Sequence, residues 1–201
     1  NVFAKTIRLD VNKFAGVSLN STGNLVNQVV TAAGADVHTT IGGANVGIID
    51  RRRSELRALA YQHYEQSCGY FPDASSATFD KRNIRDGHYP LWGSVHLLSR
   101  VGGNGVPSNP GANRFINLTL GTEEIPGLDP IALGATSSLV PQCAMRVLRN
   151  EDGGPLASFL PPRRCGCYFE SLVGTTDCQS CTSSSECPED APNCSYGYCE
   201  I

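Results

Sequence analysis

The sequence predicts an α/β domain, with a mixed sheet and flanking helices, followed by a small disulfide-rich tail. Three observations lead to this prediction. An aromatic and aliphatic run of strand length lies within residues 84–100 and contains the only Trp of the chain. Short apolar segments alternate with segments of helical spacing around that run. Seven of the nine cysteines lie between Cys165 and Cys199.

The predicted units are a domain over residues 1–150, a Pro-rich linker over 151–164 and a cysteine-rich module over 165–201. Charge also separates the last unit from the rest. The module holds six acidic residues and neither Lys nor Arg, whereas the preceding residues hold 16 basic and 13 acidic ones. Two separate units therefore account for the charge distribution better than one.

Composition limits the function classes. Hydrophobic residues make up 40% of the 201 positions, which is enough for a packed core. The net charge of −3 does not favour nucleic acid binding, and no apolar run has the length of a membrane span. The Arg51–Arg53 triplet is the one short basic run. We interpret it as a solvated helix start or loop, with contact to an anionic surface as the alternative.

The first half of the domain contains one clear helix and several candidate strands. Helical spacing of apolar residues predicts a helix between an N-cap at Ser21 or Thr22 and a stop at Gly34. Residues 46–49 are predicted to form a short buried strand. We expect a helical turn over residues 51–55 and a further strand over 59–62.

The second half is organised around residues 84–100, which we predict to be the central strand. Pro90 lacks an N–H, so it belongs at the start of the strand or on an exposed edge. Amphipathic helices are expected within residues 112–120 and 126–139. A terminal strand over residues 141–148 completes the prediction.

The best site candidate is Ser21-Thr22-Gly23 at the predicted helix N-terminus. Free N–H groups and the positive end of the helix dipole attract anions there, although a plain N-cap is the competing interpretation. The turn that contains Arg85 and Asp86 is the second candidate. Arg85 would clamp an oxyanion, or the two side chains would pair with each other.

The sequence offers little for catalysis or metal binding. It contains no G-x-S-x-G, no H-E-x-x-H and no phosphate-binding G-x-x-x-x-G-K-[ST] loop. We therefore favour a non-enzymatic protein, and we expect no cofactor. His38, His63, His88 and His96 lack metal-ligand spacing, and His96 is expected in the core because it alternates with apolar residues.

The cysteines indicate disulfides and an oxidising compartment, because the tail is too poor in apolar residues to fold on burial alone. A zinc site of four thiolates and redox catalysis are the alternatives. Cys68 is predicted to pair with Cys143, and an odd total leaves one cysteine free or bonded to another chain. The predicted disulfide cysteines are Cys68, Cys143, Cys165, Cys167, Cys178, Cys181, Cys187, Cys194 and Cys199.

The order of these segments is similar to that of a known family. The set comprises Ser21-Thr22-Gly23 before a helix, a Gly-rich strand ending in Ile48-Ile49-Asp50, Tyr89-Pro90-Leu91 before an apolar strand, Phe115-Ile116 in a helix, and Val140-Pro141 after another. Over residues 15–148 it resembles the C-terminal part of bacterial type 2 periplasmic binding proteins, especially the phosphate-binding branch. Two departures are Val46-Gly47-Ile48 in place of the family's IGY and Ser94 in place of its second Pro.

The resemblance implies an incomplete two-lobed fold, whose N-terminal lobe would precede Asn1 or come from a second polypeptide chain. It also implies a small oxyanion ligand such as phosphate, held at Ser21-Thr22-Gly23. Because the first residues, Asn1–Lys5, have no signal peptide character, we expect a processed product of a secreted precursor. The expected location is extracellular, periplasmic or at the cell surface.

Two other functions remain open. One is a structural or adhesive extracellular protein that has kept the fold without the ligand and assembles with itself or a partner chain. The other is one subunit of a proteolytically matured enzyme whose catalytic residues lie on another chain.

Overall fold

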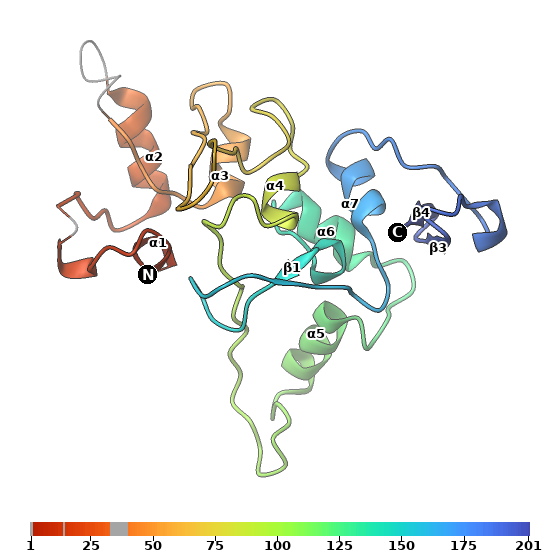
Figure 1. Ribbon diagram of the computed structural model, residues 1–201. Coiled ribbons are helices and arrows are strands. Elements are labelled where there is room, and N and C mark those ends of the chain that lie inside the picture. Colours follow the sequence, from red (N-terminus) through yellow and green to blue (C-terminus); the bar gives the residue numbers. More distant parts are fainter. Residues whose placement is uncertain (1, 14, 33–39) are drawn as a thin grey trace.

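The computed structural model describes residues 2–13, 15–32 and 40–201 (Figure 1). The elements in chain order are α1 (Val2–Thr6), η1 (Val11–Lys13), α2 (Thr22–Thr31), α3 (Val46–Arg51), α4 (Arg82–Arg85), α5 (Pro110–Leu120), α6 (Pro130–Thr136), η3 (Gln142–Ala144), β1 (Val147–Leu148), β2 (Ala157–Ser158), α7 (Gly166–Val173), η4 (Ser184–Glu186), β3 (Asn193–Ser195) and β4 (Tyr198–Glu200).

The best-defined predicted helix is confirmed as α2. Ser21 is its N-cap, with an extended backbone and a hydroxyl that accepts a hydrogen bond from the N–H of Asn24 at 3.1 Å. The helix ends at Thr31, and the predicted stop at Gly34 lies outside the described residues. The apolar side of α2 faces the chain that follows, where Gly42 lies against Leu25.

Residues 46–49 form the start of helix α3, so the predicted strand is wrong. The Asn45 side chain accepts a hydrogen bond from the N–H of Gly47 at 2.8 Å and caps the helix. A segment of four residues is too short for its hydrophobic pattern to distinguish a helix from a strand, and here the Asn45 cap starts a helix. The turn expected over 51–55 is present, whereas the expected strand over 59–62 is reduced to one bridge between Tyr61 and Tyr70.

The predicted central strand over residues 84–100 is also wrong. Its first residues belong to α4, and residues 89–100 have no regular secondary structure and form no β-bridge within the described chain. An isolated bridge between Val101 and Pro107 closes a loop beyond them. Figure 1 shows this segment leaving the body and returning as α5. A strand requires a neighbouring edge for its hydrogen bonds, and the described residues provide none.

The later elements follow the predictions in part. The helix expected within 112–120 is α5, which Asn109 caps, and α6 occupies the centre of the segment expected at 126–139. The predicted terminal strand is limited to β1 because η3 occupies its first half. Strand β2, from the predicted linker, pairs antiparallel with β1.

The fold is thus a mixture of helices and small antiparallel sheets. The described residues form two sheets of two strands each, β1–β2 and β3–β4, in place of the expected mixed sheet with flanking helices. A two-lobed arrangement is not present in this part of the chain. None of its helices has the length and apolar character needed to cross a membrane.

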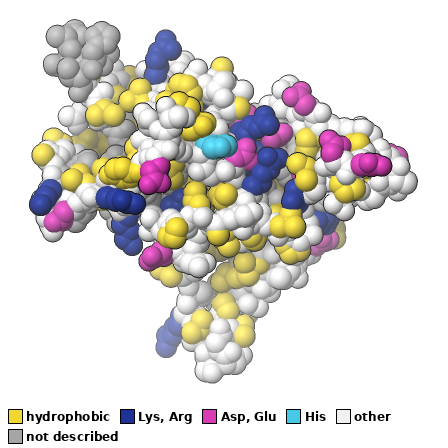
Figure 2. All heavy atoms as spheres, viewed as in Figure 1, with side chains coloured by type: hydrophobic (Ala, Val, Ile, Leu, Met, Phe, Trp, Pro, Cys, Tyr) yellow, Lys and Arg dark blue, Asp and Glu magenta, His cyan; other side chains and the backbone are white. Residues whose placement is uncertain are grey.

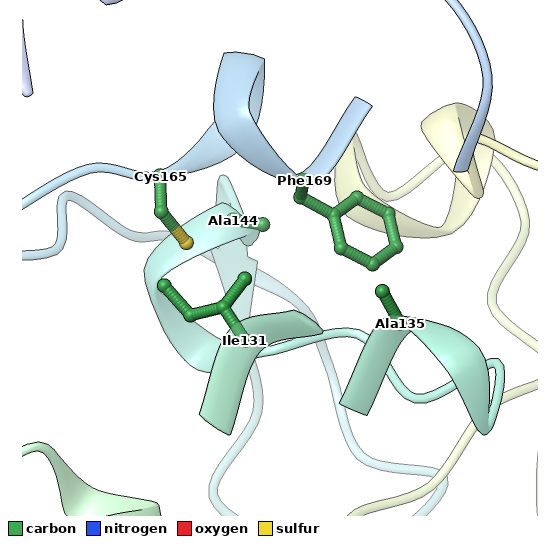
Figure 3. Close-up of a cluster of buried hydrophobic side chains, with 5 residues drawn as sticks. All are labelled: Ile131, Ala135, Ala144, Cys165 and Phe169. Atoms are coloured by element: carbon green, nitrogen blue, oxygen red, sulfur yellow. The ribbon is translucent and has the colours of Figure 1, made fainter. Parts of the chain in front are cut away.

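The main hydrophobic cluster joins the predicted domain to the predicted tail module (Figure 3). Ile131 and Ala135 of α6 pack against Cys165 and Phe169 at the start of the tail, and Ala144 of η3 completes the cluster. Phe169 and Cys165 are fully buried. Helix α7 is therefore held against the preceding residues by apolar packing as well as by a covalent link described below.

Candidate anion-binding site

The predicted site at Ser21-Thr22-Gly23 lies at the exposed N-terminus of α2. The Ser21 hydroxyl is engaged in the cap, and Thr22 and Gly23 occupy the first turn. Neither Arg85 nor Asp86 is near this turn, because α4 lies on the other side of α3 (Figure 1). The structure therefore does not gather the two sequence-predicted candidates into one site.

Arg85 holds the tail in place. Its side chain is 2% exposed, donates from Nε to the carbonyl of Ala144 at 2.9 Å, and pairs through Nη1 with Glu170 of α7 at 2.7 Å. Its guanidinium also lies over the ring of Phe169. Asp86 does not pair with Arg85, as one interpretation proposed, but contacts Arg146 at 3.2 Å.

A second group of buried charges lies beneath a cavity of about 180 Å³ between α3, α6 and α7. Lys81 contacts Asp50 and Asp73, each at 2.8 Å, and Arg53 bridges the same two carboxylates. Phe79 covers both cations. Two cations and two anions compensate each other, so this network has no surplus charge to attract an ionic ligand.

Arg149, which directly follows β1, lacks such compensation. The residue is 7% exposed, and its Nη2 donates to the carbonyl of Pro90 at 3.1 Å. Its guanidinium stacks on the indole of Trp92, 4.0 Å from the ring centroid. Within the described residues, neither Nε of Arg149 nor Nε1 of Trp92 has a hydrogen-bond partner. A desolvated guanidinium with a free donor is energetically costly unless an anion approaches it.

His63 lies within electrostatic range of both Arg149 and Arg8. Burial lowers the pKa of His63, and the positive charges of Arg8 and Arg149 lower it further. The Nδ1 of His63 lies 3.1 Å from the hydroxyl of Tyr61, and Arg8 stacks on Tyr64. We call Arg8, His63, Trp92 and Arg149 the cationic cluster.

Two acids act on the cluster without cancelling the shifts in it: Glu65 opposes the lowering of the His63 pKa, and Asp152 opposes that of the Arg149 pKa. Asp152 has other partners. It accepts a hydrogen bond from the N–H of Ser94 at 3.2 Å and contacts His96 at 3.4 Å. Burial lowers the pKa of Arg149, and the charge of Asp152 only partly opposes that effect. His96 itself is 67% exposed along its side chain, so its predicted place in the core is wrong.

The cysteines form four disulfides: Cys143–Cys165, Cys167–Cys178, Cys181–Cys194 and Cys187–Cys199. This confirms the disulfide-rich character of the tail, but the predicted pairing of Cys68 with Cys143 is wrong. Cys68 is unpaired and exposed. The spacing could not decide this, because Cys143 is brought to Cys165 by the packing of α7 on α6.

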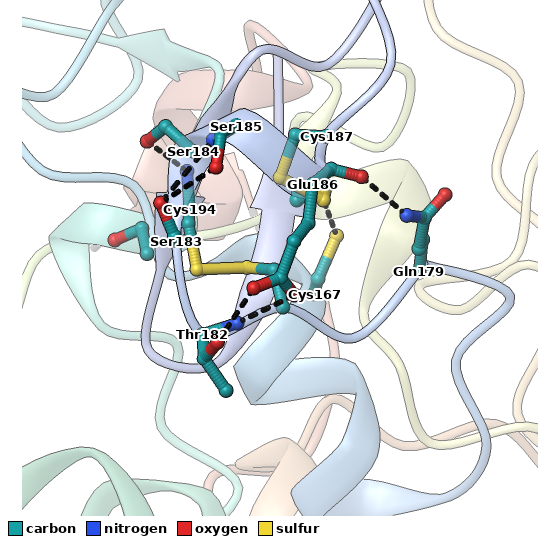
Figure 4. The surroundings of a disulfide bond; sticks show 12 residues. Cys167, Gln179, Thr182, Ser183, Ser184, Ser185, Glu186, Cys187 and Cys194 are labelled. Carbon is teal, nitrogen blue, oxygen red and sulfur yellow. Dashed lines mark hydrogen bonds between the residues drawn. A yellow bond between two sulfur atoms is a disulfide. The ribbon is translucent and has the colours of Figure 1, made fainter.

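The surroundings of these disulfides are polar (Figure 4). Glu186 organises them by accepting hydrogen bonds from the N–H and the hydroxyl of Thr182 and, through its carbonyl, from the Gln179 amide. The sulfurs of Cys181, Cys187 and Cys199 lie within 4.8 Å of one another, as zinc ligands would. All three are in disulfides, so no thiolate is free to bind a metal.

Comparisons with protein-family models, curated proteins and solved structures find no match to this chain. The resemblance to periplasmic binding proteins therefore stays a prediction. The cationic cluster was missed at the sequence level because its members are far apart in the chain. Arg149 follows two apolar residues, and nothing in that pattern distinguishes it from an exposed Arg beside a strand.

Proposed function

We propose that this chain is a non-enzymatic, extracytoplasmic solute-binding domain that binds a small oxyanion such as phosphate at the cationic cluster. The observation that carries the proposal is the buried guanidinium of Arg149, whose Nε has no partner in the described chain. The four disulfides support a location outside the reducing cytoplasm. The sequence resemblance suggests the solute-binding class, and of its ordered segments the structure keeps the helices α2, α5 and α6 but neither of the two predicted strands.

The chemistry of the cluster suits an oxyanion. Guanidinium groups present planar N–H donors that match carboxylate and phosphate oxygens, and Arg149 remains charged at every physiological pH. The indole of Trp92 holds the guanidinium plane in place. An anion here would interact with Arg149, and protonation of His63, whose pKa the charge of Arg149 lowers, would add a second positive charge.

The test is titration of the 201-residue chain with inorganic phosphate and, separately, sulfate at low ionic strength. Trp92 is the only Trp and touches Arg149, so its fluorescence reports binding directly. We expect Arg149→Gln to weaken binding at least about tenfold, a loss typical of one charge-assisted contact. Arg114→Gln is the matched control, because Arg114 is exposed and pairs with Glu123 away from the cluster.

Two further variants distinguish anion binding at the cationic cluster from binding at the N-terminus of α2. Because Arg149 is buried, His63→Gln provides a second probe with less risk to folding. It should abolish the rise in sulfate affinity expected as the pH falls through the lowered pKa of His63. Ser21→Ala should leave affinity unchanged. Equal affinity of Arg149→Gln and the unaltered chain, or a loss in Ser21→Ala alone, would remove the cluster from the proposal.

Cys68 favours a second candidate function, assembly of an extracellular structural or adhesive protein. It is the one cysteine outside the four disulfides, and it is exposed. We expect a disulfide-linked dimer on non-reducing size-exclusion chromatography, which Cys68→Ser and reductant should each remove. A monomer under oxidising conditions would count against this candidate. The enzyme-subunit alternative stays a prediction, since its catalytic residues would lie on another chain.

A further inference from the structure

Asn20 begins the stretch Asn20-Ser21-Thr22, which has the N-x-[ST] form of an acceptor for N-linked oligosaccharides. Such acceptors are used in proteins that pass through a secretory route, and the four disulfides support a location of that kind. Two other stretches have the same form, Asn117-Leu118-Thr119 and Asn193-Cys194-Ser195. The folded surroundings distinguish the three acceptors from one another.

The acceptor at Asn20 is accessible in the folded protein. Asn20 lies in an exposed bend, and α2 begins two residues later at Thr22. Its side-chain Oδ1 accepts a hydrogen bond from Nδ2 of Asn24 at 2.7 Å. Its own Nδ2, the atom that bonds to the sugar in an N-linked glycan, donates to no described residue, and neither does the hydroxyl of Thr22. Both groups that define the acceptor are thus available to a transferring enzyme.

The acceptor at Asn117 is held within a helix. Asn117 is a half-buried residue of α5, and the helix continues to Leu120. The hydroxyl of Thr119 donates to the carbonyl of Phe115, one turn earlier, at 2.8 Å. Presentation of this acceptor to an enzyme would therefore require the second half of α5 to unwind.

The acceptor at Asn193 is held by a hairpin and a disulfide. Asn193 is the first residue of β3, which pairs with β4. The hydroxyl of Ser195 donates to the carbonyl of Arg164, and Ser195 itself is buried. Cys194, between the two, is bonded to Cys181. This acceptor can be reached only before the tail has folded.

The surface around α2 also suits a bulky hydrophilic group. The segment that leads into α2 lies at the edge of the molecule (Figure 1). Val17 in this segment and Ile41, which follows α2 in the chain, are 76% and 77% exposed, and Figure 2 shows hydrophobic side chains on the surface around α2. Exposed apolar surface favours aggregation, whereas an N-linked glycan is bulky and solubilising. An oligosaccharide on Asn20 would shield Val17, three positions away.

We propose that Asn20 carries an N-linked oligosaccharide, transferred from a lipid-linked oligosaccharide diphosphate. Nδ2 of Asn20 attacks the anomeric carbon of the first sugar, and a C–N bond forms as the C–O bond to the diphosphate breaks. The electron pair of the broken bond leaves with the lipid diphosphate, and Nδ2 loses one proton to a base of the transferring enzyme. The modification is independent of anion binding and shares with the proposed function only the location outside the cytoplasm.

Peptide mapping of the protein isolated intact from its native source tests the assignment. After reduction, trypsin places the three acceptors in separate peptides, residues 14–51, 115–146 and 165–201. Peptide-N-glycosidase in heavy-oxygen water converts a glycosylated Asn into labelled Asp, and a sample without the enzyme controls for spontaneous deamidation. We expect the label at Asn20 in most copies of peptide 14–51. A peptide 14–51 with neither label nor glycan would overturn the proposal, and so would label confined to Asn117 or Asn193.

Two substitutions at Thr22, produced in the same organism, provide a matched pair. Thr22→Ala removes the acceptor hydroxyl and should abolish the glycan, whereas Thr22→Ser keeps the hydroxyl and should retain the glycan. Both variants keep the Ser21 cap of α2, so the helix can still form. A glycan that persists on Asn20 in Thr22→Ala would overturn the proposal. Phosphate titration of the deglycosylated protein tests the anion site by itself, so either proposal can fail without the other.

Discussion

Removal of the Cys143–Cys165 disulfide should destabilise the body of the molecule and not only its tail. This bond alone among the four reaches into residues 1–150. Its cysteines are 22 positions apart, for which loop-closure entropy gives about 3.4 kcal/mol at 25 °C. Cys165 is fully buried against Phe169, so its truncation to Ala adds the cost of a small cavity.

The matched control is the bond between Cys181 and Cys194, inside the tail. Its cysteines are 13 positions apart, and the same relation gives about 2.9 kcal/mol. The two double Ala variants thus lose similar closure entropy, but the first bond links the tail to residues 1–150 and the second lies within the tail. Urea unfolding followed by Trp92 fluorescence reports on the body, because Trp92 stacks on Arg149 beside β1.

We expect the Trp92 transition to shift to lower urea only in the Cys143→Ala, Cys165→Ala variant. At a slope of about 2 kcal/mol per M, a loss of about 3.4 kcal/mol lowers the midpoint by roughly 1.7 M. A midpoint unchanged in this variant would refute the reasoning that the bond stabilises the body. Equal shifts in both variants would instead mean that tail and body unfold as one unit.

Two further substitutions test local features. Tyr168→Phe removes the hydrogen bond to Asp129 between α7 and α6, at about 1 kcal/mol because both side chains are partly exposed. In denaturation curves, the difference in unfolding free energy between this variant and the unaltered protein should vanish at both pH extremes. At low pH it is lost as Asp129 is protonated, below 3.8 because its pKa is lowered. At high pH it is lost between 10.0 and about 12, the raised pKa of Tyr168. Gly87→Ala should lower the melting temperature more than Gly105→Ala. Both positions have positive φ, but a Cβ at Gly87 would lie 3.0 Å from Val147, whereas Gly105 has open space.

The causes of the Asp129 and Tyr168 shifts fix these signs. Burial alone would raise the pKa of Asp129, but the Tyr168 hydroxyl and two backbone N–H groups outweigh it and lower the pKa. The hydrogen bond to Asp129 is the main reason that the pKa of Tyr168 is raised. A constant difference between Tyr168→Phe and the unaltered protein from pH 3 to 12 would contradict this account.

Local signals were enough to predict the helices with strong caps. Ser21 before α2 and the Pro-initiated start of α5 act within one turn, so their effect is visible in the sequence. The strands depended on distant partners. Residues 95–99 have a suitable pattern for a strand, yet they find no neighbouring edge in the described chain. The hydrophobic pattern of a segment shows that it is able to form a strand, but a strand forms only where a neighbouring strand offers hydrogen-bond partners.

The site was less predictable than the fold for a similar reason. A helix N-terminus is recognisable from three residues, whereas the members of the cationic cluster, at positions 8, 63, 92 and 149, are far apart in the sequence. Arg85 illustrates the limit. Its neighbours in the sequence indicate a turn, but its role is set by Glu170 and Ala144, which are 85 and 59 positions away. Burial of an Arg beside a distant carboxylate leaves no local pattern.

The disulfide arrangement also determines how the protein responds to proteolytic nicking. Arg163 and Arg164 form a dibasic pair within the segment that Cys143–Cys165 spans. A trypsin-like cut there leaves both fragments attached until a reductant is added. Between Cys143 and Cys199, only Gly166 and the Gln179-Ser180 pair lie outside a closed loop, and Gly166 is buried. Loss of the last 21 residues therefore requires cleavage near Gln179, where backbone hydrogen bonds to the β4 hairpin hold the chain.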